Sequence, residues 1–208
     1  GLDVARVRGT KNPDLDAILA LAPDLVVANE EENRAPDVRA LRDNGVVVWV
    51  TDIRCVPTAL ASLERLLELI DAPERRWLAE ARQVWGIGAE PAAYPVPHVT
   101  AVVAIWRRPW MFLGRDTYAG DLLARLGVAN ALGRHADRYP RLALAELPAH
   151  DLVVLPDEPY AFSASDGPEA FPGTRVALVD GQALTWYGPR MVQAHPTLEA
   201  QLAGESPA

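Results

Sequence analysis

Cysteine is nearly absent from this sequence, and its scarcity excludes several kinds of structure. Cys55 is the single cysteine among 208 residues, so no internal disulfide can form and no pair of thiolates is available for a zinc site. Long apolar runs are missing as well. The longest, such as LVVA and VVVWV, fall far below the roughly 20 residues that a membrane-spanning helix requires. We therefore expect a folded chain without a disulfide scaffold and without a membrane span.

Positive charge is also in short supply. The 20 Lys and Arg residues are outnumbered by 28 Asp and Glu residues, which gives a net charge of −8. The basic residues are scattered and form no stripe that could follow a phosphate backbone. This charge distribution excludes nucleic acid as an expected partner.

Catalytic motifs are the third absence. The sequence contains no Gly-x-Ser-x-Gly elbow, no phosphate-binding P-loop and no His-Glu-x-x-His zinc motif, and its four histidines lie far apart. An enzyme would need titratable residues that converge, for which Asp116, Asp157 and Glu158 are the clustered candidates. We expect that the protein is not an enzyme, and that it holds no intrinsic cofactor and no protein-bound metal.

What the sequence does contain is an alternation of helical and strand-like segments. Asn12-Pro13 is typical of a helix start, and the apolar strand DLVVAN follows at residues 24–29. A second helix is expected over residues 35–44, stopped by Gly45, before the strand VVVWV. The second half repeats this rhythm, with DLVVLP at residues 151–156. Such alternation predicts an α/β fold with parallel strand pairing, in two lobes with central sheets.

Between the halves lies the longest helical region of the sequence. Leucines recur at helical spacing from residue 58 onward, with a break at Ala72-Pro73 and more helix up to residue 85, before a stretch rich in proline and glycine. We therefore divide the chain into a partial N-terminal lobe at residues 1–57, a connecting backbone helix with its linker at 58–95, and a C-terminal lobe at 96–208.

The C-terminal lobe is predicted in the same way. We expect a helix at residues 117–126 closed by Gly127, a helical AELPA segment near residue 146, a turn at Asp180-Gly181 and a last helix at residues 189–202.

Aromatic residues gather where the predicted strands end, which is where open α/β sheets bind ligands. Rings in such loops can wall a large apolar ligand, although the same rings could instead cover the lobe core. The predicted ligand-binding residues are these rings together with two polar side chains: Trp106, Trp110, Tyr160, Phe162, Trp186, Tyr187, Asn29 and Arg190.

Two stretches resemble a known family. GTKNPDLDAILALAPDLVVANEEENRAPDVRALRDNGVVVWVTD is similar to the first-lobe signature of the helical-backbone (class III) periplasmic binding proteins of ABC importers, and WRRPWMFLGRDTYAGDLLARLGVANALG is similar to the start of their second lobe. The segments GTKNP, EENR and GRDTYAGDLL are most similar to cobalamin-binding members. The resemblance implies a solute-binding protein that holds cobalamin in the cleft between its lobes.

Two alternatives stay open at this point. A ferric siderophore or haem receptor of the same fold would use Arg107, Arg108, Arg115 and Arg190 for an anionic chelate, and haem would favour an axial His or Tyr. The other alternative is a cytosolic corrinoid-handling protein or enzyme on a similar scaffold.

The resemblance also implies partners and a location. Family members dock on the membrane subunits of an ABC importer through one surface carboxylate per lobe, and these positions fall on Asp16 and, beside Ala145, on Glu146. They are periplasmic or extracytoplasmic, with membrane anchoring through an N-terminal segment as a further expectation.

Family members also begin with another strand and helix, so the resemblance implies an incomplete N-terminal lobe. Cobalamin-binding members have tryptophans near the positions of Thr10 and Asn29, which this sequence lacks.

Overall fold

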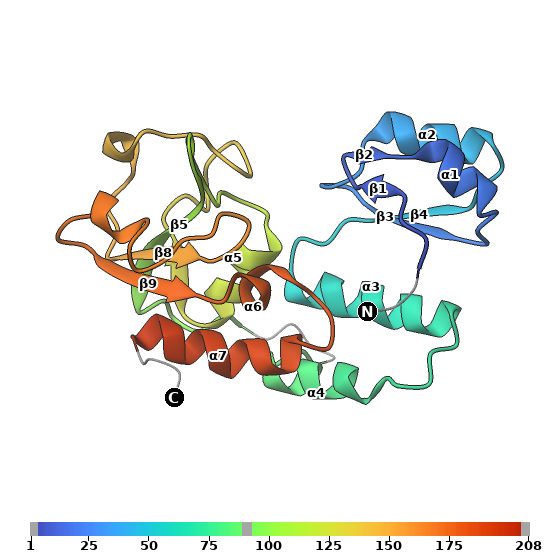
Figure 1. The fold of residues 1–208 in the computed structure, drawn as a ribbon. Helices are drawn as coiled ribbons and strands as arrows, with labels where there is room; N and C mark the ends of the chain where they lie inside the picture. Colours follow the sequence, from blue (N-terminus) through green and yellow to red (C-terminus); the bar gives the residue numbers. More distant parts are fainter. Residues whose placement is uncertain (1–3, 89–92, 205–208) are drawn as a thin grey trace. The chain divides into compact units, whose positions relative to one another are not determined.

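The computed structural model describes residues 4–88 and 93–204 (Figure 1). Residues 89–92, in the predicted linker, lie outside the described residues. The chain divides into two compact units, Gly1–Ile53 and Arg54–Ala208. The helices after residue 55 pack within the second unit, while the role of residues 58–95 as a connector between lobes stays a prediction.

The first unit is a small α/β layer. Its strands β3 and β4 pair in parallel, with Val26 opposite Val48, and the core beneath the helices consists of Ile18, Ala28, Val38, Leu41 and Val48. The elements are, in order, β1 (Arg8–Gly9), β2 (Asn12–Pro13), α1 (Leu15–Ala20), β3 (Val26–Asn29), α2 (Ala35–Asp43) and β4 (Val48–Thr51).

The start of α1 corrects the sequence prediction. Asn12-Pro13 does not open the helix but forms β2, which pairs antiparallel with β1. Asp14 is the N-cap, because its carboxylate accepts a hydrogen bond from the Ala17 N–H at 3.1 Å. The end of α2 is as predicted, with Gly45 in the left-handed region at φ 82°.

The second unit is built on a five-stranded sheet. Strands β7, β5, β8 and β9 are parallel, and β6 runs antiparallel to β5 beyond the end of β7. The elements are α3 (Val56–Leu69), α4 (Arg76–Val84), β5 (Val99–Arg107), β6 (Trp110–Phe112), α5 (Tyr118–Arg125), β7 (Val128–Asn130), η1 (Leu144–Glu146), β8 (Leu152–Pro156), η2 (Pro168–Ala170), β9 (Arg175–Val179), α6 (Gly181–Thr185) and α7 (Met191–Ala203).

The two faces of this sheet are covered differently. Helices α5 and α7 pack on β7 and β9, with α7 beneath the strands in Figure 1. The other face is covered mainly by loops, whose aromatic and aliphatic side chains close over Val102, Ala104, Val153 and Leu155. All five residues of β8 are buried, as expected for a parallel strand covered on both faces.

Three elements of the second unit bear on the sequence predictions. The helical region breaks between α3 and α4, where Ala72-Pro73 predicted a break. The AELPA segment forms only the short 3-10 turn η1, because Pro148 prevents a longer helix. Asp180-Gly181 is not a turn: the Asp180 carboxylate caps α6 by accepting from the Ala183 N–H at 2.8 Å. Trp186 therefore ends a helix and not a strand.

No helix within residues 4–88 or 93–204 is both long enough and apolar enough to cross a membrane.

Candidate functional site

The carboxyl ends of the parallel strands bring most of the predicted ligand-binding residues to one edge of the second unit. Strand β5 ends at Arg107, β8 at Pro156 and β9 at Val179, and parallel strands end at a common edge. Trp106 lies at the end of β5, Tyr160 and Phe162 follow β8, and Trp186 follows the helix after β9. The topology thus places these rings where a ligand is expected.

Four of the rings form what we call the aromatic cluster: Trp106, Trp110, Tyr160 and Phe162. The ring centroids of Trp106 and Tyr160 are 5.6 Å apart in an edge-to-face arrangement, and those of Tyr160 and Phe162 are 4.6 Å apart. Phe162 is stacked on Trp110 with a centroid distance of 6.0 Å. Edge-to-face and offset-stacked pairs at these separations are favourable. The cluster is therefore a continuous aromatic unit that links the β5–β6 hairpin to the loop after β8.

Burial separates the members of the aromatic cluster. Phe162 is only 4% exposed and belongs to the core, and Trp110 is half-buried against that core. Trp106 is 40% exposed and Tyr160 is half-buried. Trp106 and Tyr160 can meet a ligand directly, whereas Phe162, predicted as a ligand contact, packs in the core and supports the other rings.

Trp186 and Tyr187 differ from each other in the same way. Trp186 is 55% exposed. Tyr187 is half-buried and meets Tyr118 edge to face at 5.6 Å. Tyr118 is 6% exposed, its hydroxyl has no hydrogen-bond partner among the described residues, and burial raises the pKa of this phenol well above its usual range. Trp186 is thus the more accessible ring of this pair.

The predicted polar ligand contacts are engaged within the protein. Arg190 is exposed and forms an ion pair with Asp180 at 2.9 Å, and it also donates to Gln182. In the first unit, the Asn29 side chain accepts from the Glu31 N–H at 2.9 Å and donates to Thr51 at 3.3 Å. Asn29 therefore holds the turn after β3 and Arg190 pairs with the N-cap residue of α6, and their contact with a ligand stays a prediction.

The acids that an enzyme would need are also used structurally. Asp157 accepts the Gly181 N–H at 2.7 Å, and Glu158 accepts from Gln182 at 3.0 Å, so both hold the start of α6. Asp116 lies 3.7 Å from Arg115 on the loop after β6. Across the two described ranges, no group of three or more His, Cys, Asp and Glu residues could hold a metal ion.

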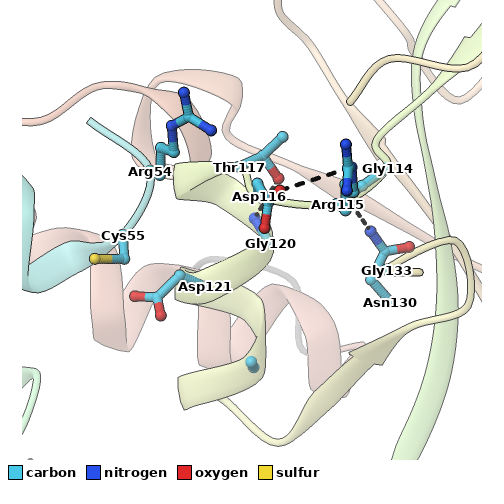
Figure 2. A pocket seen from close by; sticks show the side chains of 11 residues that line it. Arg54, Cys55, Gly114, Arg115, Asp116, Thr117, Gly120, Asp121, Asn130 and Gly133 are labelled. Atoms are coloured by element: carbon cyan, nitrogen blue, oxygen red, sulfur yellow. Dashed lines mark hydrogen bonds and ion pairs between the residues drawn. The ribbon is translucent and has the colours of Figure 1, made fainter. Parts of the chain in front are cut away.

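A pocket of about 430 Å³ was not anticipated from the sequence. It lies in the second unit, between the start of α3 and the loop that leads from β6 into α5 (Figure 2), and is lined by Arg54, Cys55, Gly114, Arg115, Asp116, Thr117, Gly120, Asp121, Ala124, Asn130 and Gly133. The glycine-containing GRDTYAG segment was the available signal, since glycines leave room beside a helix start.

The well-buried polar groups of this pocket are satisfied by the protein itself. Thr117 caps α5 by accepting the Gly120 N–H at 3.2 Å, and Asn130 donates to the carbonyl oxygens of Leu113 and Gly114 at 2.9 Å. Arg115 and Asp116 are about half exposed. The pocket is therefore a concave surface whose buried polar groups hold the fold, while Arg115 and Asp116 face solvent.

Asp121 is the most connected side chain of the pocket wall. Its carboxylate, 7% exposed, pairs with Arg125 at 2.9 Å and accepts the Val56 N–H at 2.8 Å, and it also accepts from the Tyr94 hydroxyl. The hydrogen bond to Asp121 is the main reason why the pKa of Tyr94 is raised. Asp121 thus joins the start of α3, helix α5 and the segment before β5.

The two predicted docking acids are both exposed. Asp16 lies in the first turn of α1. Glu146 lies in η1, where its carboxylate accepts the Ala143 N–H at 2.6 Å. The second acid therefore has a local structural role that the sequence did not reveal.

No protein-family model matches the sequence, and no curated protein matches it. Solved structures do. A periplasmic vitamin B12 binding protein, BtuF of Vibrio cholerae, is similar with a TM-score of 0.77 and 16% identity over 97% of this chain and 82% of that chain. The periplasmic haem-binding protein BhuT, solved with two haems, has a TM-score of 0.73 and 23% identity over 97% of this chain and 83% of that one. The haem-binding protein RhuT from Roseiflexus sp. RS-1 has a TM-score of 0.68 and 19% identity over 94% and 81% of the two chains.

These likenesses confirm the fold predicted from the sequence motifs. The chain has the α/β fold of the helical-backbone periplasmic binding proteins. Identities below 25% establish the fold and leave the ligand to be argued from the site.

Proposed function

We propose that this protein is the solute-binding component of an ABC importer and that it binds a large metal chelate, with cobalamin as the predicted ligand. The observation that carries this proposal is the set of exposed rings at the carboxyl-end edge of the second unit, above all Trp106 at 40% and Trp186 at 55% exposure. Exposed apolar side chains that gather in one patch mark binding surfaces, and Trp106 and Tyr160 are in contact at this edge. The fold is one in which similar structures bind vitamin B12 or haem.

In this proposal the ligand is held reversibly and no bond is made or broken. Trp106, Tyr160, Trp186 and Tyr187 supply apolar and stacking contacts, each ring burying on the order of 150 Å² or more when fully covered. Trp110 and Phe162 support Trp106 and Tyr160 from the core side. Asn29 and Arg190 are the proposed polar contacts to ligand amides.

Haem or a ferric siderophore is the second candidate ligand. Arg54 and Arg115 line the pocket beside α5, and guanidinium groups suit the carboxylates or catecholates of an anionic chelate. The similar structures include haem-binding proteins at 19% and 23% identity. Cobalamin and haem differ in charge and in visible spectrum, so they can be separated by experiment.

The partners and location follow from the same proposal. The protein would meet the membrane subunits of an importer through Asp16 and Glu146, and it would act in the periplasm or another extracytoplasmic space. An enzymatic role receives little support from the site, because Asp157 and Glu158 are engaged at the start of α6.

The test is a titration of the purified protein with cyanocobalamin, haem and a ferric siderophore in turn, followed by visible spectra and calorimetry. We expect cyanocobalamin to bind with micromolar or better affinity, which is about 8 kcal/mol of binding free energy. Binding of haem or the siderophore alone would transfer the assignment to the second candidate. If none of the three binds, the proposal of a metal-chelate receptor is wrong.

A further inference from the structure

We propose that Arg107 is a positioning residue for the ligand-facing rings: it ties the loop between β8 and β9 to the end of β5 and so fixes Tyr160 against Trp106. The inference rests on the proposed function, because it assigns to Arg107 the organisation of that same binding surface. Arg107 need not touch the ligand.

The first step is the pairing of Arg107 itself. Its side chain is 17% exposed and forms ion pairs with both Asp166 and Glu169. Its guanidinium also lies over the Trp110 ring, 5.6 Å from the ring centroid. A guanidinium can serve two carboxylates and an aromatic face at once because it is planar and carries five N–H donors.

The second step leads from Asp166 to the exposed rings. The Tyr160 hydroxyl donates to Asp166 Oδ2 at 2.7 Å, so Asp166 is shared by Arg107 and Tyr160. Tyr160 in turn meets Trp106 edge to face at 5.6 Å. The chain of contacts therefore starts at Arg107, passes through Asp166 and Tyr160, and returns to Trp106, the neighbour of Arg107 on β5.

The third step is the attachment of Glu169. Its carboxylate accepts the Gly167 N–H at 2.7 Å, and this backbone hydrogen bond is the main cause of a lowered pKa at Glu169, with Arg107 adding to it. Glu169 therefore keeps its charge at neutral pH and remains available to Arg107.

The loop needs such a tie. Between β8 and β9 the chain runs from residue 157 to residue 174 with only the short turn η2 as regular structure, and irregular connections of this length are uncommon unless other contacts hold them. Ring positions on a loose loop would cost conformational entropy on ligand binding. The partly buried Arg107, paired with two acids of the loop, lowers that cost before the ligand arrives.

Arg108 provides a matched control for the experiment. It is the next residue, it carries the same charge, and it is exposed. Among the residues that the structure describes, it forms no ion pair. Comparing Arg107→Gln with Arg108→Gln therefore separates the loss of the Arg107 ion pairs from a general loss of positive charge near the site.

We expect Arg107→Gln to weaken binding of cyanocobalamin, measured by calorimetry, by roughly tenfold or more, the scale of coupling within one salt-bridge network. Arg108→Gln should change this affinity less than about twofold. Arg107→Lys keeps the charge but loses the planar guanidinium with its several N–H donors, so its loss of affinity should lie between those of the two Gln variants. In a Tyr160→Phe background, Arg107→Gln should have a smaller effect, since the link through the hydroxyl is already removed.

A second readout does not need a ligand. Acrylamide quenching of tryptophan fluorescence should increase in Arg107→Gln, and this increase should vanish when Trp106 is replaced by Phe. If Arg107→Gln does not fold, Asp166→Asn cuts the same link and is measured in its place. Unchanged affinity and unchanged quenching, or equal losses in the Arg107 and Arg108 variants, would overturn the inference. Absence of binding by the wild type would instead count against the proposed function. The quenching result would still show whether Arg107 holds the loop between β8 and β9 against the end of β5.

Discussion

Individual aromatic residues take different roles although they share one edge of the sheet. Phe162 is buried at 4% exposure, while Trp106 and Trp186 are 40% and 55% exposed. A buried ring contributes mainly to stability, because removing it leaves a cavity. An exposed ring contributes little to folding and is available for a ligand.

The first prediction separates these roles. Phe162→Ala should lower the free energy of unfolding by about 3 to 5 kcal/mol, measured by urea denaturation. Trp106→Ala and Trp186→Ala should each weaken ligand binding by roughly 1 to 4 kcal/mol while leaving the unfolding free energy nearly unchanged. If all three variants chiefly lose stability, the exposed rings belong to the fold and not to a binding surface.

Tyr118 carries the second prediction. Its hydroxyl is buried without a partner among the described residues, which is an energetic cost that Phe would not carry. Tyr118→Phe should therefore raise the free energy of unfolding by about 1 kcal/mol at neutral pH.

The same substitution has a pH signature. Burial raises the pKa of Tyr118, so above about pH 10 the phenol ionises in the unfolded chain before it does so in the folded one. Wild-type stability should then fall as pH rises, and the fall should be smaller in Tyr118→Phe. Equal slopes of unfolding free energy against pH above 10 for the two proteins would contradict the assignment.

At the scale of the elements, side-chain carboxylates and hydroxyls determine where helices begin and how they are joined. Asp14, Thr117 and Asp180 cap α1, α5 and α6. Asp121 does more, because its carboxylate links α5 to the first residue of α3 and to Tyr94. The second unit therefore has a polar junction near the point where it begins.

The third prediction tests this junction. Asp121→Ala should cost about 3 to 5 kcal/mol of unfolding free energy, because it leaves Arg125, 11% exposed, without its carboxylate. Tyr94→Phe removes only one of the three donors and should cost about 1 kcal/mol. Denaturant unfolding followed by circular dichroism distinguishes the two, and equal small losses would show that the junction contributes little.

At the scale of the whole molecule, the two predicted docking acids lie on short helical segments, one in each unit. Asp16 is in the first turn of α1, and Glu146 is in η1 with its carboxylate on the Ala143 N–H. An acid at a helix start is favoured by the helix dipole in any case. Exposure alone therefore does not distinguish a docking role from a local one.

The fourth prediction distinguishes them by what changes. The Asp16→Arg, Glu146→Arg double variant should bind ligand in solution as the wild type does, yet lose uptake into vesicles that carry the cognate importer, because like charges would meet at the interface. The Asp16→Asn, Glu146→Gln variant is the matched control, since Gln can still accept the Ala143 N–H while the charge is removed. It should reduce uptake less. Normal uptake by the charge-reversed variant would make both acids ordinary surface residues.

Much of the fold follows from local sequence. Strands β3, β8 and β9 are apolar runs, of which β8 is buried along its whole length, and Gly45 and Gly127 end helices as their left-handed backbone allows. The placement of Trp106 and Tyr160 at or just after strand ends was also predictable, because it depends on residues adjacent in the chain. The family resemblance placed a surface carboxylate at Asp16, which is exposed in the first turn of α1. The local prediction was wrong where two neighbouring segments could both start a helix. Asn12-Pro13 resembles a helix start, but Asp14 is the N-cap of α1.

The tertiary structure decided everything that depends on residues far apart in the chain. Burial of Phe162 and exposure of Trp106 result from how the loop after β8 closes on β5 and β6, and no periodicity encodes that closure. The pairing of Arg107 with Asp166 and Glu169, like the contact of Asp121 with Val56, joins segments about 60 residues apart. Side-chain hydrogen bonds and ion pairs act over a few ångströms in space, so only the folded chain determines which partners they have.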